Sequence, residues 1–299
     1  MYWLFVVLGG HLSNAGAFVI DKVLLQKTMK YPSVYVFYIG VLGLLAFILL
    51  PFSRFSLMPN YLMLQAAVSG VTFMVALLGF FTVLQREEAT RVIPFFGGLI
   101  PVWTLAFAAV FLGERLSSHE WWGVILLIVG AVLISYEPDG GSGTMSWRLA
   151  ALIALSAGCF ALSSTLLKAV FNGTSFLNGF LWTRLFASLA VLPLLLLPAT
   201  RRAVVGRGES GASLPSALLF IGQTLGALGF VLLAWGTNLA PRVTIVNALQ
   251  GVQYALLFIF VVLLHAWRPG LIPEHLSPAI VTQKVSALAL LSIGLVLVA

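Results

Sequence analysis

The sequence predicts an all-α integral membrane protein with ten transmembrane helices arranged as two inverted five-helix repeats. Composition is the first observation: 61% of the residues are hydrophobic and 8% are charged, against about 25% charged residues in soluble domains. Secondly, the apolar runs lack strict alternation and reach roughly twenty residues, which is typical of membrane-spanning helices. Thirdly, the pattern from Arg91 to Ile134 returns in degenerate form after Arg242. These observations exclude a water-soluble fold.

Ten apolar segments follow one another along the chain, each long enough to cross a bilayer. We place them at residues 2–25, 34–52, 61–84, 92–112, 119–135, 148–170, 176–198, 214–239, 243–265 and 281–298. Because each repeat has an odd number of spans, the second repeat must enter the membrane from the opposite side. The halves would then be related by a pseudo-two-fold axis in the membrane plane, with a substrate site at their interface.

The joint between the halves is Tyr136–Thr144, whose proline, aspartate and glycine content indicates a flexible loop. We therefore expect a first repeat at residues 1–137, a linker at 138–147 and a second repeat at 148–299. Residues 199–213 contain arginines and three glycines, so a mobile loop is predicted there as well.

The fourth span contains Pro94 and Pro101. Each proline removes a backbone donor and crowds the preceding turn, which predicts a kinked or locally unwound helix. Gly97 and Gly98 lie between the prolines and allow close packing or an exposed carbonyl.

His11, Asn14 and Asp21 lie on one face of the first span, at spacings of three and seven residues. Polar groups are expensive at membrane depth, so this face is predicted to line a cavity. Hydrogen bonding between helices is the alternative. His11 and Asp21 are the candidates for proton coupling, because an imidazole titrates near neutral pH and Asp21 is, apart from Glu120 at the start of the fifth span, the one acidic residue expected within a span.

Four residues of the ninth span share one face, and two of them carry amides that can both donate and accept hydrogen bonds. They are Asn247, Gln250, Gly251 and Tyr254, with Gln253 on the flank. At the repeat offset of 151 positions, Phe96, Leu99, Val102 and Trp103 of the fourth span correspond to Asn247, Gln250, Gln253 and Tyr254. A polar wall facing an aromatic wall suits an amphipathic small molecule, whereas amides that only tie helices together are the alternative.

Two more polar residues are candidates for substrate binding. Gln223 lies in the eighth span beside a row of glycines. Arg184 lies in the seventh span, where it is either a counter-charge for a carboxylate or phosphate or a membrane-edge residue that snorkels to headgroups.

The turn Gly113-Glu114-Arg115-Leu116, followed by Glu120-Trp121-Trp122-Gly123 and Gly130–Ile134, resembles the end of an EamA domain. This domain is the repeat of ten-helix transporters in the drug/metabolite transporter superfamily. The second half departs from the pattern, with Ala266–Pro269 in place of the turn. The resemblance implies a metabolite carrier, often an exporter of amino acids or related molecules. It also implies a cavity lined mainly by spans one, three, four, six, eight and nine.

Several classes of function are disfavoured by what the sequence lacks. The single cysteine, Cys159, excludes an internal disulfide or a multi-thiolate metal site, and the four histidines are scattered. We expect no metal, cofactor or catalytic residue. A membrane-embedded enzyme acting on lipids or lipid-linked sugars, or a scaffold without transport, are the alternatives. Nucleic acid is not an expected partner, because the basic residues are dispersed.

The expected partners are therefore a small molecule and the lipid bilayer, with the protein a monomer or a dimer. The scarcity of acidic residues in the spans favours neutral, zwitterionic or anionic solutes over cations.

Two arguments on the orientation of the protein in the membrane disagree. The basic residues gather in the odd-numbered loops, which places the termini outside. The family resemblance implies termini inside, and we expect a multi-pass protein of the bacterial inner membrane in that orientation.

Overall fold

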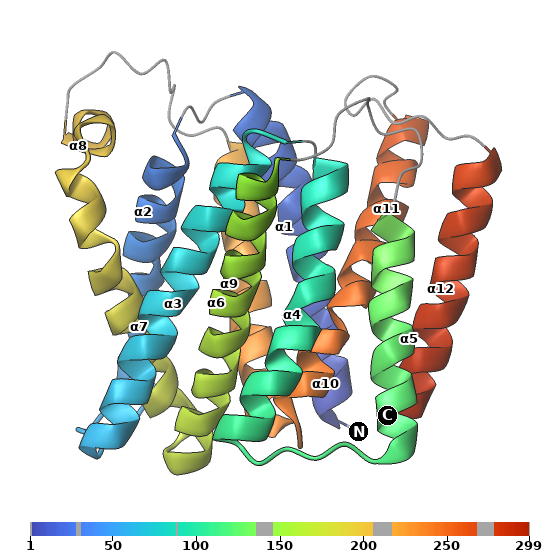
Figure 1. Cartoon of the computed structure of the whole chain (residues 1–299). Helices are drawn as coiled ribbons and strands as arrows, with labels where there is room; N and C mark the ends of the chain where they lie inside the picture. Colours follow the sequence, from blue (N-terminus) through green and yellow to red (C-terminus); the bar gives the residue numbers. More distant parts are fainter. Residues whose placement is uncertain are drawn as a thin grey trace.

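A computed structural model describes residues 2–27, 31–87, 89–135, 146–205, 217–267 and 278–298. Every regular element within these residues is a helix. The helices lie side by side in alternating directions, and the N- and C-termini lie at the same end, the lower one in Figure 1.

The helices of the first half correspond closely to the first five predicted spans. They are α1 (Tyr2–Lys27), α2 (Pro32–Leu42) continued by the 3-10 helix η1 (Gly43–Phe52), α3 (Asn60–Leu84), α4 (Ala89–Phe111) and α5 (Ser118–Ser135).

The second half contains more helical segments than the first. Its helices are α6 (Trp147–Gly173), α7 (Phe176–Ala190) with the 3-10 helix η2 (Leu192–Leu196), α8 (Pro198–Val205), α9 (Ala217–Leu239), α10 (Val243–Ala248), α11 (Gln250–Trp267) and α12 (Pro278–Val298). The short helix α8 corrects the prediction of a mobile loop over 199–213 in its first part, and residues 206–213 lie outside the described residues. Most of the predicted linker, 138–145, lies outside them as well.

Six helical segments in the described part of the chain are long and apolar enough to cross a membrane. They are Tyr2–Ile20, Pro32–Phe52, Asn60–Leu84, Trp147–Gly173, Phe176–Leu196 and Phe220–Leu239. Shorter apolar helical stretches lie at Phe95–Phe111, Val243–Leu257 and Val285–Gly294. The chain is thus an all-helical, multi-pass integral membrane protein.

The local unwinding predicted for the fourth span is not found, because α4 is α-helical from Ala89 to Phe111 in spite of its two prolines. In the ninth span, α10 ends at Ala248 and α11 begins at Gln250. Leu249 between them keeps helical backbone angles (φ −65°, ψ −8°), and its N–H donates to the Ile245 carbonyl at 3.0 Å.

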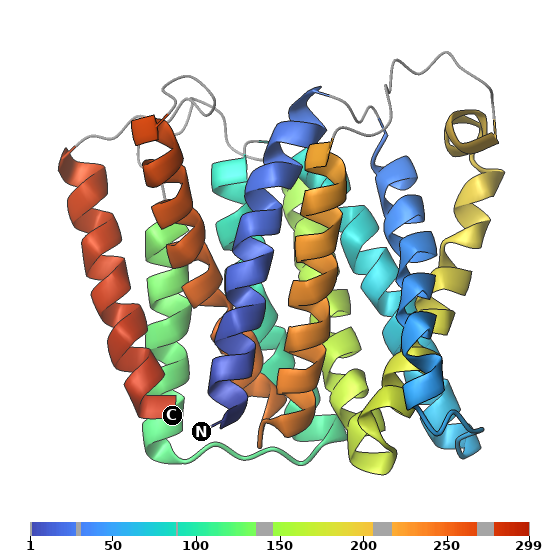
Figure 2. The same cartoon turned by 180° about the vertical axis from the view of Figure 1, so that it is seen from behind.

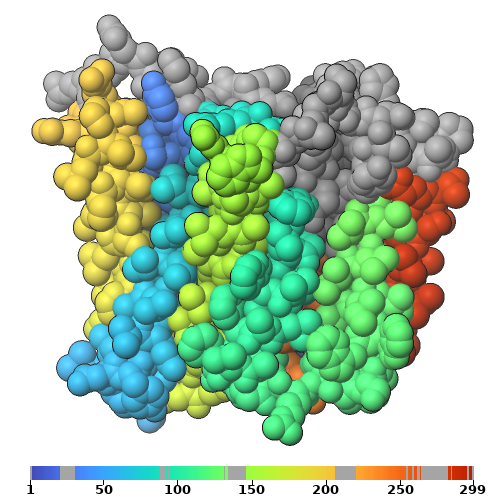
Figure 3. Space-filling model, in the orientation of Figure 1, coloured from blue at the N-terminus to red at the C-terminus, as the bar shows by residue number. Residues whose placement is uncertain are grey.

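The longest packing contacts join helices from different halves. Helix α1 packs along α9, and Figure 2 shows the pair side by side. Helix α3 packs along α6, whose side chains fill the space between α3 and α4 in Figure 3. Ser69 of α3 and Ser163 of α6 each donate a 2.8 Å hydrogen bond to the other's backbone carbonyl. The two halves are therefore interleaved rather than separate.

Candidate functional site

Next to Leu249 in the ninth span, a buried polar side chain makes hydrogen bonds between the two halves of the chain. Asn247, two residues before Leu249, is 8% exposed. Its Nδ2 donates to Thr104 Oγ1 of α4 at 2.8 Å and to Ser164 Oγ of α6 at 2.7 Å. Both hydroxyls in turn donate to carbonyls of their own helices, so each stays hydrogen-bonded independently of Asn247. The amide thus joins three helices at one point.

A second polar contact lies on the other side of Leu249. His11 Nδ1 of α1 lies 3.0 Å from Gln253 Oε1 of α11, and both side chains are almost completely buried. An imidazole nitrogen facing a carbonyl oxygen must donate, which places the proton on Nδ1. His11 Nε2 then becomes an acceptor, and it has no partner within the described part of the chain.

An aromatic wall lies against these helices. Phe96 of α4 is 6% exposed, and its ring centroid lies 4.6 Å from that of Phe80 and 5.9 Å from that of Phe160. Trp103 stacks on Phe107 with ring centroids 5.7 Å apart. The indole also passes over Gly158 of α6, where a Cβ atom would meet it at 3.5 Å. The two aromatic candidates therefore lie between α4 and α6.

The other predicted site residues are not all brought together. Gln223 Nε2 of α9 donates to the Tyr35 hydroxyl of α2 at 3.3 Å. Asn14 packs against Gly229 of α9, so close that a Cβ atom there would lie 2.2 Å from its Oδ1. Gln250 is half-buried, and no hydrogen bond reaches it from the described residues. Helix α1 contains Asp21 and α11 contains Tyr254, but both side chains lie outside the described set.

Arg184 is buried in the middle of a span, which rules out the interpretation as a snorkelling residue. The side chain is 7% exposed. Its guanidinium carbon lies 3.7 Å from the ring centroid of Phe230 and 5.0 Å from that of Phe73. Its Nε has no hydrogen-bond partner among the described residues.

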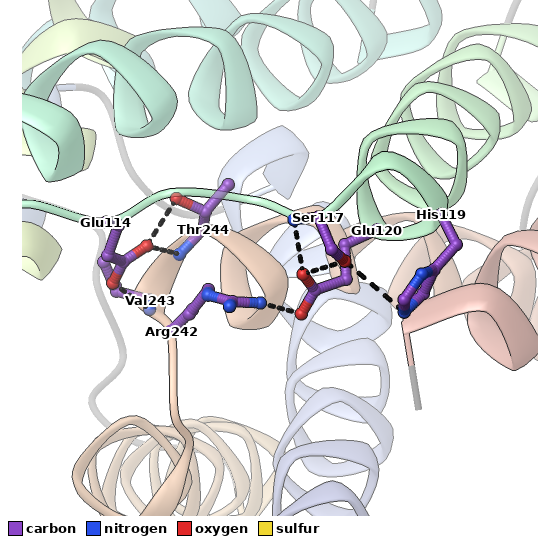
Figure 4. A network of polar contacts seen from close by, with 7 residues as sticks. All are labelled: Glu114, Ser117, His119, Glu120, Arg242, Val243 and Thr244. Atoms are coloured by element: carbon purple, nitrogen blue, oxygen red, sulfur yellow. Dashed lines mark hydrogen bonds and ion pairs between the residues drawn. The ribbon is translucent and has the colours of Figure 1, made fainter.

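At the end that carries both termini, the turn after α4 is bound to the start of α10 (Figure 4). Glu114 accepts hydrogen bonds from the Val243 N–H at 2.8 Å, from the Thr244 N–H at 3.4 Å and from Thr244 Oγ1 at 2.8 Å. The first N–H groups of α10 receive no hydrogen bond from the side chain of their own N-cap residue, Arg242. The carboxylate of Glu114, from the other half of the chain, accepts from them instead.

Three further charged residues complete this connection. Arg242 forms an ion pair with Glu120, which also accepts from the Ser117 N–H in a capping box. Lys168 of α6 donates to the carbonyls of Asn238 and Ala240 at the end of α9, close enough to Glu114 for the charges to interact. We call Glu114, Glu120, Lys168, Arg242 and Thr244 the inter-half latch.

Sequence reasoning missed most of the polar partners at this interface. Thr104 and Lys168 are isolated polar residues in apolar helices, and Ser164 lies in the run Ser163–Thr165; only the rarity of such residues at membrane depth could have identified them. Gln253 was placed on the flank of the predicted stripe, yet it is more deeply buried than Gln250. Glu114 was noted as part of a turn, without its partner on α10.

Three comparisons with known proteins agree with this picture. Residues 1–136 match the EamA-like transporter family. An uncharacterized protein of Methanocaldococcus jannaschii is 25% identical over 114 residues, which are 38% of this chain and 82% of that protein. A protein of known crystal structure is similar over 99% of this chain and 97% of its own, with a TM-score of 0.70 and 13% identity, which shows the fold alone. Residues 1–136, a little less than half of the chain, are thus similar to the EamA-like transporter family.

Proposed function

We propose that the protein is a secondary transporter that moves small metabolites, such as amino acids or related solutes, by alternating access between two inverted five-helix repeats. The repeats are residues 1–137 and 148–299, and the direction is export or facilitated diffusion. The observation that carries the proposal is the pair of buried polar contacts on either side of Leu249 in the ninth span, where Asn247 and Gln253 bind residues of α4, α6 and α1. Substrate sites of transporters built from two repeats lie at the interface between the repeats.

The pairing of helices supports the inverted repeat. If spans one to five correspond to spans six to ten, the contact of α1 with α9 corresponds to that of α6 with α3, and both are observed. Spans two and seven both end in 3-10 helices, η1 and η2. Helices α1 and α6 also run in opposite directions in Figure 1, as corresponding helices of inverted repeats must.

The inter-half latch supports alternating access, because it holds one end of the interface closed. Beneath it, the buried residues Ile245 and Leu249 belong to an apolar cluster that also includes Val7 of α1 and Leu127 of α5. Because the latch consists of hydrogen bonds and ion pairs, the two halves can separate at this end while each half stays folded. We assign this end to the cytoplasm, as the family resemblance implies, although the positive-inside rule favours the opposite end, where α8 carries Arg201 and Arg202.

The test is flux in proteoliposomes that contain the purified protein, with pools of labelled amino acids and related metabolites inside. We expect saturable efflux that empty liposomes lack. Efflux that proceeds without a pH gradient would establish a facilitator or exchanger. Efflux only with a gradient would bring His11 and Asp21 into the mechanism as proton carriers. Absence of flux for every pool would contradict the proposal.

A further inference from the structure

Arg184 is a charge at membrane depth without a counter-charge from its neighbours. The helices that surround its guanidinium are α3, α7 and α9, and none of them contains an aspartate or glutamate. Within the described part of the chain, no acceptor binds its Nε, which is completely enclosed. An arginine in this position is unfavourable unless an anion accompanies it.

The contacts that Arg184 does make are to the faces of aromatic rings. Its guanidinium carbon lies 3.7 Å from the ring centroid of Phe230, 5.0 Å from Phe73 and 5.9 Å from Phe180. Cation–π contacts stabilise the charge but leave the N–H edge of the guanidinium unused. That edge suits two oxygens of a carboxylate or phosphate.

The surroundings of Arg184 indicate what would be attached to the anion. Phe230 contacts Phe73, whose ring contacts Phe160, and Phe160 contacts Phe96. This aromatic row leads from Arg184 on α7 across α9, α3 and α6 to the wall of the site on α4. An apolar or aromatic group next to the anion would lie against these rings, whereas a strongly hydrated ion would lose its water there.

We propose that Arg184, together with Phe73, Phe180 and Phe230, forms the subsite that binds the anionic group of the transported solute, an organic carboxylate with an apolar or aromatic body. The inference rests on the proposed transport function and narrows its substrate class. It selects carboxylates from the neutral, zwitterionic and anionic solutes that the sequence leaves open. The same guanidinium edge would also fit the phosphate of a lipid headgroup, so the experiment separates the two sources.

The experiment is a thermal-shift titration of the full-length protein in nanodiscs of neutral phosphatidylcholine. The probes are 3-phenylpropionate, its neutral amide and inorganic phosphate. A ligand that binds only the folded protein raises its Tm with concentration. We expect 3-phenylpropionate to raise Tm saturably, and the amide and inorganic phosphate to require at least tenfold higher concentrations.

Three variants test the role of the guanidinium. Arg184→Met should abolish the Tm shift by 3-phenylpropionate. Arg184→Lys, which keeps the charge but cannot donate two parallel hydrogen bonds, should reduce that shift. Arg148→Met is the matched control, because Arg148 lies over the Trp147 ring at 5.8 Å but is exposed at the start of α6. Without a probe, Arg184→Met should unfold at the wild-type temperature or above, because it removes an uncompensated charge. A lower Tm would show that Arg184 holds the fold without an anion and would overturn the proposal.

Other outcomes would also overturn it. One is a Tm shift by the neutral amide that equals the shift by 3-phenylpropionate, and another is an equal shift by 3-phenylpropionate in Arg184→Met. A third is a rise in Tm that appears only when phosphatidylglycerol replaces phosphatidylcholine in the nanodiscs, which would assign the site to a lipid headgroup. Binding is measured apart from flux, so the two proposals fail separately. Flux that is insensitive to Arg184→Met would leave the transport function standing and remove the subsite.

Discussion

Replacing Asn247 with leucine is expected to reduce flux in proteoliposomes at least tenfold while leaving the protein folded. Among the described residues of the ninth span, Asn247 is the one side chain that hydrogen-bonds to both α4 and α6. A tenfold loss corresponds to about 1.4 kcal/mol of lost stabilisation in the transport step. The cost in folding should be small, because Thr104 and Ser164 keep their hydrogen bonds to Ile100 and Ala161.

Flux and Tm of the Asn247→Leu variant are to be compared with those of Gln283→Leu. Gln283 is also an amide that crosses between helices, since its Nε2 donates to the Leu133 carbonyl at 2.7 Å, but it joins α12 to α5 at the outer edge. Normal flux in Asn247→Leu together with a large loss in Tm would show that the amide only ties helices together.

Removing the charge of Glu114 is expected to open the latched end. In Glu114→Gln, one acceptor oxygen becomes an N–H group that faces the donors of Thr244. Hydrogen bonds to a charged group are worth about 1.5–3 kcal/mol each, so we expect Tm to fall by several degrees. A cysteine at position 250 should then react faster with a membrane-impermeant maleimide added at the latched side.

The labelling uses a Cys159→Ser background, because Cys159 is the single cysteine of the chain. Glu87→Gln is the control, since Glu87 lies in the turn after α3, at the end opposite the latch. If Glu114→Gln lowers Tm but leaves labelling at position 250 unchanged, Glu114 is a structural cap and not part of a gate.

The positions of the helices could be predicted from the sequence because the bilayer imposes the length and the apolarity of each span. The bounds of α3 at residues 60–84 and of α5 at 118–135 differ by one residue at most from those predicted. Local unwinding of the fourth span is predicted from its prolines, but a proline marks only a potential break, and α4 stays helical. Leu249, between α10 and α11, carries no local signal for a helix end.

The partners within the site could not be predicted, because they depend on how the halves pack. His11 and Gln253 are 242 residues apart in the chain, and Glu114 and Thr244 are 130 apart. Helical periodicity indicates which residues share a face, but not which face another helix meets. For the same reason Asn14, grouped with His11 by its spacing, proves to pack against Gly229. Burial of Arg184 likewise follows from the rings of α3 and α9, which lie far from it in sequence.

Reversible crosslinking of the latch tests alternating access most directly. Cysteines replace Glu114 and Thr244 in the Cys159→Ser background, and flux is measured before and after a short bifunctional methanethiosulfonate reagent joins them. We expect flux to stop on crosslinking and to return when a reductant releases the reagent, while either single cysteine variant stays active under the same treatment. Flux that continues with the two positions joined would show that this end need not open, and would contradict the transport mechanism proposed for this protein.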